Sequence, residues 1–297
     1  MGEGHPECPQ RLDAIEDQLL MAGVLDLLRP CEAPEVAEAD VLRAHTAAHW
    51  QHLQTCHDDV ILQGQRVSLD ADTAMNAHSL EAARRAAGAA VSAVDAVLSG
   101  AAHHAFCAVR PPGHHATANQ AMGFCLLNNV AIAAHHALAQ GLARVAVIDF
   151  DVHHGNGTED IVAEVPGLLM LGFYQHPFYP LGGAQREAEN LCNVPVPAYT
   201  RGQALRDIMA QQWWPRLAAF DPDLILISAG FDAHREDDLG QLGMVEADYA
   251  WLTRYLVRET RAGQSGRIVS CLEGGYNLSA LGRSVLAHVR ELAELSG

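Results

Sequence analysis

The chain has 297 residues, which is enough to bury the core of one large domain or of two small ones. It carries 36 acidic and 19 basic residues and a formal net charge of -17, which argues against nucleic acid or an anionic membrane as its main partner. Its seven scattered cysteines form no Cys-x-x-Cys pair, and no apolar run approaches the roughly 20 residues of a membrane span, so we expect a soluble protein of the reducing cytoplasm without a signal peptide.

Helical patterns dominate the N-terminal third of the chain. We expect helices at about residues 10–22, 40–56 and 79–98, with Asp40 as the N-cap of the second. The second helix also carries four histidines, some at the i, i+4 spacing of a metal pair: His45, His49, His52 and His57. Since no carboxylate or cysteine cluster supports them, we interpret them as a histidine-rich helix face.

The first expected strand, residues 105–109, runs directly into Arg-Pro-Pro-Gly-His-His. The two prolines and the glycine fix an irregular backbone that an ordinary turn does not require, and they present His114 and His115 beyond the strand. An alanine-rich helix at about residues 127–139 then leads to a second strand from Arg144, which makes a βαβ unit of normal length.

Acids and histidines follow this second strand. After Arg144, residues 145–148 are apolar without alternation, as expected for a strand buried on both faces of a parallel sheet. Asp149 and Asp151 stand at its carboxyl end, where open α/β sheets bind their ligands. Asp151 and His153 leave the same face of an extended segment and are able to share one divalent ion. The alternative is that the acids cap a following helix and the histidine lies at the surface.

The rest of the chain continues the alternation of strands and helices. Strands are expected at residues 168–171, 224–228 and 267–271, and helices at about 203–220, 246–262 and 279–295. No internal repeat or linker divides them, so we predict one α/β domain over residues 1–297, with an open, mainly parallel sheet and helices on both faces. Residues 172–197 lack a periodic pattern, and we expect a long functional loop there.

Two further strand ends carry reactive groups, Asp232 in Ser-Ala-Gly-Phe-Asp-Ala-His and Tyr276 in Leu-Glu-Gly-Gly-Tyr. Three protein ligands with an open fourth position are typical of catalytic zinc. The chain offers such a set in Asp151, His153 and Asp232. His114 and His115 would then be the acid–base pair, and Tyr276 would donate its hydroxyl to an oxyanion.

Taken together, these motifs resemble the zinc-dependent histone deacetylase family. Arg-Pro-Pro-Gly-His-His, Asp-Phe-Asp-Val-His-His-Gly-Asn-Gly-Thr, Ser-Ala-Gly-Phe-Asp-Ala-His and Leu-Glu-Gly-Gly-Tyr occur in the family's order and span most of the chain. Asn156 and the Glu-Gly-Gly-Tyr form are more similar to class II and to the bacterial histone deacetylase-like amidohydrolases than to class I. The resemblance implies the arginase/deacetylase-type fold.

The resemblance also implies roles for individual residues. It implies a zinc ion held by Asp151, His153 and Asp232. His115 would be the general base and then the general acid, with His114 as its electrostatic partner and Asp149 orienting His114. Asn156 would orient His115 without adding charge, which leaves that imidazole less basic than an aspartate partner would.

Three further features follow from the resemblance. The family binds a structural monovalent cation, usually potassium, through Asp149 and nearby backbone, but Gly172 and Tyr174 replace a serine and a histidine expected at that site. The implied substrate-binding residues are Phe124 and Tyr179 as walls of a narrow tunnel for the acyl-lysine stem, Gly123, Gly275, and Arg11 lining an inner cavity. Family members usually have a strand before the His-Pro-Glu motif, which this chain lacks.

We therefore predict a deacetylase that hydrolyses acetyl-lysine to free amine and acetate. Three alternatives stay open: hydrolysis of acetylpolyamines or other small acylamines, a two-manganese ureohydrolase on a related fold, and a non-catalytic protein that binds acylamines. The ureohydrolase typically needs an aspartate two residues after the metal histidine, where this chain has Gly155. The oligomeric state, including a homo-oligomer, stays open as well.

Overall fold

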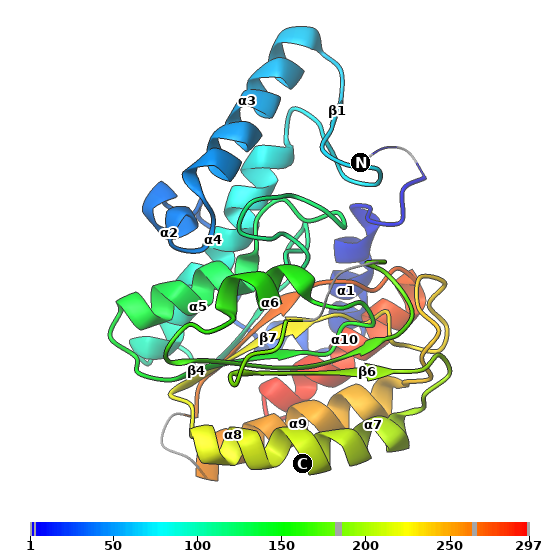
Figure 1. The fold of residues 1–297 in the computed structure, drawn as a ribbon. Coiled ribbons are helices and arrows are strands. Elements are labelled where there is room, and N and C mark those ends of the chain that lie inside the picture. Colours follow the sequence, from blue (N-terminus) through cyan, green and yellow to red (C-terminus); the bar gives the residue numbers. More distant parts are fainter. Residues whose placement is uncertain (1, 3, 182–185, 263–265, 296–297) are drawn as a thin grey trace.

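The structure is a computed structural model, and it describes residues 2, 4–181, 186–262 and 266–295 (Figure 1). Its centre is a six-stranded sheet in the order β3-β8-β7-β4-β5-β6, and every neighbouring pair is parallel. The strands are β3 (His104–Cys107), β4 (Val145–Asp149), β5 (Leu168–Gln175), β6 (Leu191–Val196), β7 (Leu224–Ala229) and β8 (Ile268–Leu272). The prediction of an open, parallel α/β sheet is confirmed.

The central strands are buried on both faces. In β4, Ala146 and Ile148 pack into one apolar cluster, whereas Val145 and Val147 pack into another on the opposite side. Successive side chains of a strand point to opposite faces, so a continuous apolar run suits a sheet that is covered twice.

Helices cover the two faces of the sheet (Figure 1). One cluster includes side chains of α4 (Ser79–Leu98), α5 (Asn129–Ala139) and α6 (Asn156–Val162). The other includes side chains of α1 (Gln10–Met21), the π-helical η2 (Met209–Trp213), α8 (Trp214–Phe220), α9 (Glu246–Ala262) and α10 (Leu278–Leu292), and α7 (Gly202–Ile208) leads into η2. No helix among the described residues has the length and apolarity needed to cross a membrane.

A third cluster lies in the part of the chain that extends away from the sheet (Figure 1). It involves α2 (Glu38–Ala44), α3 (Ala47–Gln63) and the small antiparallel pair of β1 (Val67–Ser68) and β2 (Ala74–Met75); a short 3-10 helix, η1 (Leu25–Leu27), precedes them.

The single helix predicted over residues 40–56 is wrong. The backbone is extended at His45, so α2 ends there, and Thr46 caps α3 by accepting a hydrogen bond from the His49 amide. The N-cap of α2 is Ala37, and Asp40 lies inside the helix. Its carboxylate is engaged elsewhere, 3.0 Å from Nδ1 of His136 on α5.

The long loop predicted over residues 172–197 is also wrong in part. Strand β5 continues to Gln175, and residues 191–196 form β6 at the edge of the sheet. Pro195 hides this strand in the sequence, because proline is tolerated in a sheet chiefly at an edge.

Candidate active site

The predicted site residues meet at one edge of the sheet because four adjacent parallel strands end there. His114 and His115 follow β3, and Asp149 ends β4 with Asp151 two residues beyond it. Asp232 follows β7, and Tyr276 follows β8. These four strands are neighbours in the order β3-β8-β7-β4. Their carboxyl ends therefore lie side by side at one edge of the sheet, where open α/β sheets commonly bind their ligands.

One group of side chains among the described residues is able to hold a metal ion: Asp151, His153 and Asp232. Their ligand atoms lie within 4.8 Å of one another. Nδ1 of His153 is 3.0 Å from Oδ1 of Asp151 and 3.2 Å from Oδ2 of Asp232. Both carboxylates are fully buried, and burial together with Asp151 raises the pKa of Asp232 to about 7. Two buried carboxylates this close repel each other, and a divalent cation between them would remove that cost.

Gly274 lies against this cluster. Its amide donates to Oδ2 of Asp151 at 2.9 Å. A Cβ atom at this position would stand 1.9 Å from Oδ2 of Asp232 and 2.6 Å from Oδ2 of Asp151. The glycine of Leu-Glu-Gly-Gly-Tyr is therefore required for close approach of the backbone to the carboxylates.

The two histidines of Pro-Gly-His-His lie side by side, with ring centroids 4.1 Å apart. Nδ1 of His114 is 3.0 Å from Oδ2 of Asp149, and Nδ1 of His115 is 2.8 Å from Oδ1 of Asn156. Because the amide oxygen of Asn156 only accepts, Nδ1 of His115 is assigned the proton and Nε2 is left to accept another.

The charge of the pair is set by its surroundings. Burial, His114 and His153 lower the pKa of His115 well below its ordinary value, so its imidazole is neutral. Burial opposes protonation of His114 too, but Asp151 and Asp149 raise its pKa well above the ordinary value. One histidine is thus held ready to accept a proton beside another that carries charge.

Tyr276 lies between an aromatic ring and a guanidinium. Its ring centroid is 6.0 Å from that of Phe124 in a T-shaped contact, and the guanidinium carbon of Arg11 is 4.9 Å from the ring. Arg11 is fully buried and donates to the carbonyl of Gly275 at 2.7 Å. Arg11 therefore lies on the inner side of the turn that carries the tyrosine.

Aromatic rings surround the histidines. Tyr179 makes a T-shaped contact with His115 at 5.0 Å, and Phe178 stacks on His153 at 5.4 Å. Gly123 is needed beside Phe124, because a Cβ there would stand 2.4 Å from the ring of His115. The sequence analysis missed Phe178, although its place next to Tyr179 in Pro-Phe-Tyr-Pro is a signal.

Two buried carboxylates were also missed. Asp237 accepts the amides of Tyr276 and Asn277 at 2.6 and 2.9 Å, and Glu273 accepts those of Gly113 and His114. The sequence does not show that an acid bonds to the backbone. The available signal is the position of these two acids in or near a motif.

The histidine-rich segment takes no part in the site. His45 has Nδ1 at 2.9 Å from the carbonyl of Thr117 and accepts the amide of Asn128 at Nε2. Nε2 of His49 lies 2.9 Å from the carbonyl of Leu126. Both rings are buried structural groups, whereas the sequence pattern indicates a histidine-rich helix face without a metal role.

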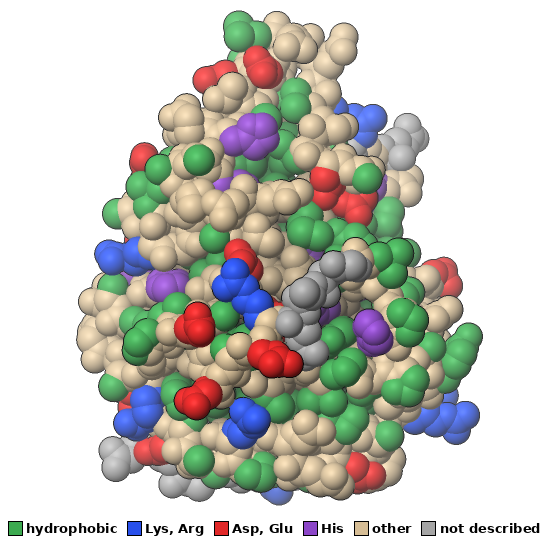
Figure 2. Space-filling view, in the orientation of Figure 1, with side chains coloured by type: hydrophobic (Ala, Val, Ile, Leu, Met, Phe, Trp, Pro, Cys, Tyr) green, Lys and Arg blue, Asp and Glu red, His purple; other side chains and the backbone are tan. Residues whose placement is uncertain are grey.

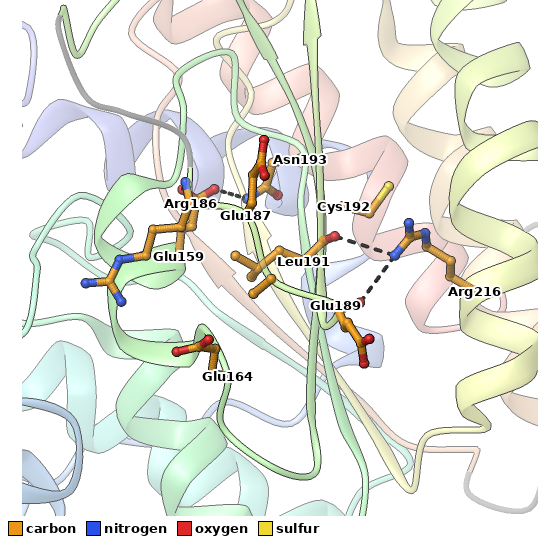
Figure 3. A pocket seen from close by; sticks show the side chains of 10 residues that line it. Glu159, Glu164, Arg186, Glu187, Glu189, Leu191, Cys192, Asn193 and Arg216 are labelled. Atoms are coloured by element: carbon orange, nitrogen blue, oxygen red, sulfur yellow. Dashed lines mark hydrogen bonds between the residues drawn. The ribbon is translucent and has the colours of Figure 1, made fainter.

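A separate hollow of about 610 Å³ lies beside β6 and α6 (Figure 3). Two of its polar side chains are already engaged: Glu159 bonds to His154 and to Asn193, and Arg216 donates to the carbonyls of Glu189 and Leu191. None of the catalytic candidates lines it. On the face shown in Figure 2, basic side chains lie apart from one another and form no continuous patch.

Known proteins are similar to this chain in sequence and fold. The histone deacetylase domain matches residues 5–292. The crystal structure of the HDA15 HD domain superposes with a TM-score of 0.92 at 34% identity, covering 100% of this chain and 85% of that one. The histone deacetylase-like amidohydrolase of Pseudomonas aeruginosa is 34% identical over 98% of this chain and 77% of its own length.

The polyamine deacetylase HDAC10 of Mus musculus is 38% identical over 96% of this chain, which spans only 44% of that protein. A match across almost the whole chain, an arginase/deacetylase-type sheet and relatives that are hydrolases agree with one another. The chain therefore belongs to the histone deacetylase family of hydrolases.

Proposed function

We propose that the chain is a zinc-dependent deacetylase that hydrolyses acetyl-lysine, or another N-acetylated amine, to the free amine and acetate. The observation that carries the proposal is that three side chains of metal-ligand type lie together at the sheet edge, with the ring of His115 5.8 Å from that of His153 and with Tyr276 after the neighbouring strand β8. A non-catalytic binding protein would not need both a polarised histidine pair and a tyrosine at the same edge as a metal cluster.

The cluster fits zinc. Asp151, His153 and Asp232 are two oxygen donors and one nitrogen donor, as in catalytic zinc sites with an open position. Among the described residues, the buried Oδ2 of Asp232 accepts no hydrogen bond apart from its 3.2 Å approach to Nδ1 of His153, which is itself a candidate ligand, and this leaves a lone pair for a metal. When bound, zinc would polarise the amide carbonyl and lower the pKa of a water molecule.

The side chains supply the proton transfers. Nε2 of His115 takes a proton from the attacking water as the water oxygen adds to the carbonyl carbon. The hydroxyl of Tyr276 donates a hydrogen bond to the oxyanion that forms. His115 then gives its proton to the amine nitrogen as the carbon–nitrogen bond breaks. Asn156 holds His115 in the tautomer that this sequence of transfers requires.

This chain offers fewer side-chain ligands for the monovalent cation of the family. Gly172 has no side chain to offer, and the ring of Tyr174 packs against His154 at 4.4 Å. We infer that a potassium ion here would depend on Asp149 and on backbone carbonyls.

The two-manganese alternative is disfavoured by the packing at Gly155. A Cβ at this position would stand 2.2 Å from Oδ2 of Asp149, so a bridging carboxylate has no room there. Elemental analysis that finds two metals per chain would nevertheless restore this alternative.

Acetylpolyamines are the second candidate substrates. The net charge is -17, and Asp70 and Asp72 act electrostatically on Tyr179, beside the histidine pair. A polycationic amine would gain from such carboxylates. The relative named as a polyamine deacetylase adds support for this class.

One preparation of zinc-loaded protein decides between the substrates. We expect faster turnover, as kcat/KM, on an acetyl-lysine peptide than on acetylated spermidine; the opposite order would favour the polyamine. The chain contains no lysine, so an amine-reactive dye reads the released amine with little background from the protein.

Tyr276→Phe is the matched variant for the mechanism. It should lose on the order of 10²–10³ in kcat, as removal of one oxyanion donor does elsewhere, while its zinc content stays unchanged. Full activity in Tyr276→Phe would overturn the assignment.

A further inference from the structure

Glu273 is a buried acid that the proposed reaction does not use. It follows β8 directly, three positions before Tyr276 in the chain, and none of its surface is exposed. Its Oε2 accepts the backbone amides of Gly113 at 2.6 Å and His114 at 3.0 Å, and Ser228 donates its hydroxyl to Oε1 at 3.2 Å. One side chain thus binds the loop of the histidine pair and the end of β7.

The backbone of Glu273 is fixed as firmly as its side chain. Its amide donates to the carbonyl of Ala229 at 2.9 Å, and its carbonyl accepts Nη2 of Arg11 at 2.5 Å. Arg11 also holds the carbonyl of Gly275, one residue before Tyr276. The turn that carries the tyrosine is therefore anchored to the sheet, and the Glu273 side chain reaches from this anchor to the histidine loop.

The histidine loop has an irregular backbone that needs such a partner. The amides of Gly113 and His114 both point at the one carboxylate oxygen, while the carbonyl of His114 is bonded by the amide of Thr158. A buried amide left without a partner would cost free energy, so the carboxylate selects the loop conformation that satisfies both.

We propose that Glu273 is a positioning residue that sets the distance between the His114–His115 pair and Tyr276. This inference rests on the proposed function, since it concerns the geometry of the same reaction. A displacement of about 1 Å of a catalytic group is able to cost on the order of 10²-fold in rate. For this role the length of the Glu273 side chain matters, and its charge does not.

The hydrogen bonds of Glu273 to the histidine loop do not require a charged carboxylate. Burial, with a contribution from Asp149, raises the pKa of Glu273 to about 7, against the opposing effect of His114 and the two amides. An amide oxygen at the same place accepts the same two N–H groups, and an amide nitrogen is able to bond to the hydroxyl of Ser228. Glutamine is therefore a close mimic in shape.

Two conservative variants distinguish the effect of side-chain length from the effect of charge. E273Q keeps the length of the side chain and loses its charge, whereas E273D keeps the charge and is one methylene shorter. We expect E273Q to retain kcat within about 3-fold and E273D to lose on the order of 10- to 100-fold, with KM changed less than about 3-fold in both.

Hydrogen exchange at the backbone amides of residues 113–116, followed by mass spectrometry, reads the geometry of the loop without activity. E273D should exchange faster there than the wild type, and E273Q should resemble the wild type. The control is Asp248, another buried carboxylate with three hydrogen bonds, from Arg206 and the amide of Val245. D248N should lower Tm and leave kcat and the exchange of this loop unchanged.

The outcomes are distinct. Loss of kcat in E273D with retention in E273Q supports the proposal, and equal kcat in the two variants or the reverse order overturns it. If the wild type hydrolyses no acylamine, the proposed function fails, and unchanged exchange in E273D would overturn the positioning role independently.

Discussion

Histidines occur in two regions of this molecule with very different surroundings. At the edge of the sheet, His114, His115 and His153 face carboxylate or amide side chains. At the end of α2 and in the first turn of α3, His45 and His49 bond to backbone groups of the loop that precedes α5. The spacing in the sequence looks suited to a metal in both regions, so the partners of a histidine, and not its spacing, decide its role.

The two regions also differ in charge. Burial and His49 lower the pKa of His45 to about 3, so that ring is neutral and serves as a structural hydrogen-bonding group. His114 is also buried, but Asp151 and Asp149 raise its pKa instead. Burial alone makes a neutral histidine, and nearby acids make a charged one.

His115→Ala tests the role of the histidines at the sheet edge and should have the largest effect on kcat. Removal of the proton-transferring group should reduce kcat on an acetyl-lysine peptide by on the order of 10²–10⁴-fold. Zinc content and Tm should stay close to those of the wild type, because His115 is not a metal ligand. Retention of more than a tenth of the activity would contradict the role given to this histidine.

His45→Ala tests the structural side. The carbonyl of Thr117 and the amide of Asn128 would be left buried without their partner, which should cost about 1–3 kcal/mol in the free energy of unfolding. Urea denaturation measures this cost, and kcat per folded molecule should not change. A loss of activity greater than the loss of folded protein would show that the two regions are coupled.

The cost of His45→Ala should depend on pH with a definite sign. The folded pKa of His45, about 3, lies below the unfolded value, so its stabilising contribution is complete above about pH 6.5 and falls as the pH falls from there toward 3. Unfolding measured at about pH 8 and about pH 5 should show the smaller cost at pH 5. An equal cost at both values would contradict the lowered pKa.

His136 should show the opposite dependence with a smaller effect. Its Nδ1 is 3.0 Å from Asp40 and its Nε2 is 2.8 Å from Asp95, and although burial opposes protonation, Asp95 and Asp40 raise its pKa. Its contribution is complete below about pH 6.5 and is lost as the pH rises through the raised pKa. His136→Gln should cost less than about 1 kcal/mol after solvent screening, and more at about pH 6 than at about pH 9. A larger cost at the higher pH would contradict this account.

Much of the site was predictable because it follows directly from strand ends. The apolar runs before Asp149 and Ser228 announce buried strands, and parallel strands bring their carboxyl ends together. The edge strand β6 was not predictable in the same way, because Pro195 and the polar Asn193 interrupt its apolar run, and proline is tolerated in a sheet chiefly at an edge.

Residues that act through the backbone were the hardest to predict. Glu273 was part of a recognised motif, but its bonds to Gly113 and His114 join segments 159 and 160 residues apart. Asp40 looks like a helix cap in the sequence, yet its carboxylate pairs with His136 on another helix. Such partners depend on tertiary packing, which local patterns do not encode.

We propose that Asp151, His153 and Asp232 hold one zinc ion at the edge of the sheet. Elemental analysis of the wild type and of Asp232→Asn, purified in parallel with His45→Ala as the control, tests it most directly. We predict one zinc per chain in the wild type and in His45→Ala, and a large loss in Asp232→Asn. Full zinc in Asp232→Asn, or zinc lost from His45→Ala, would contradict the account.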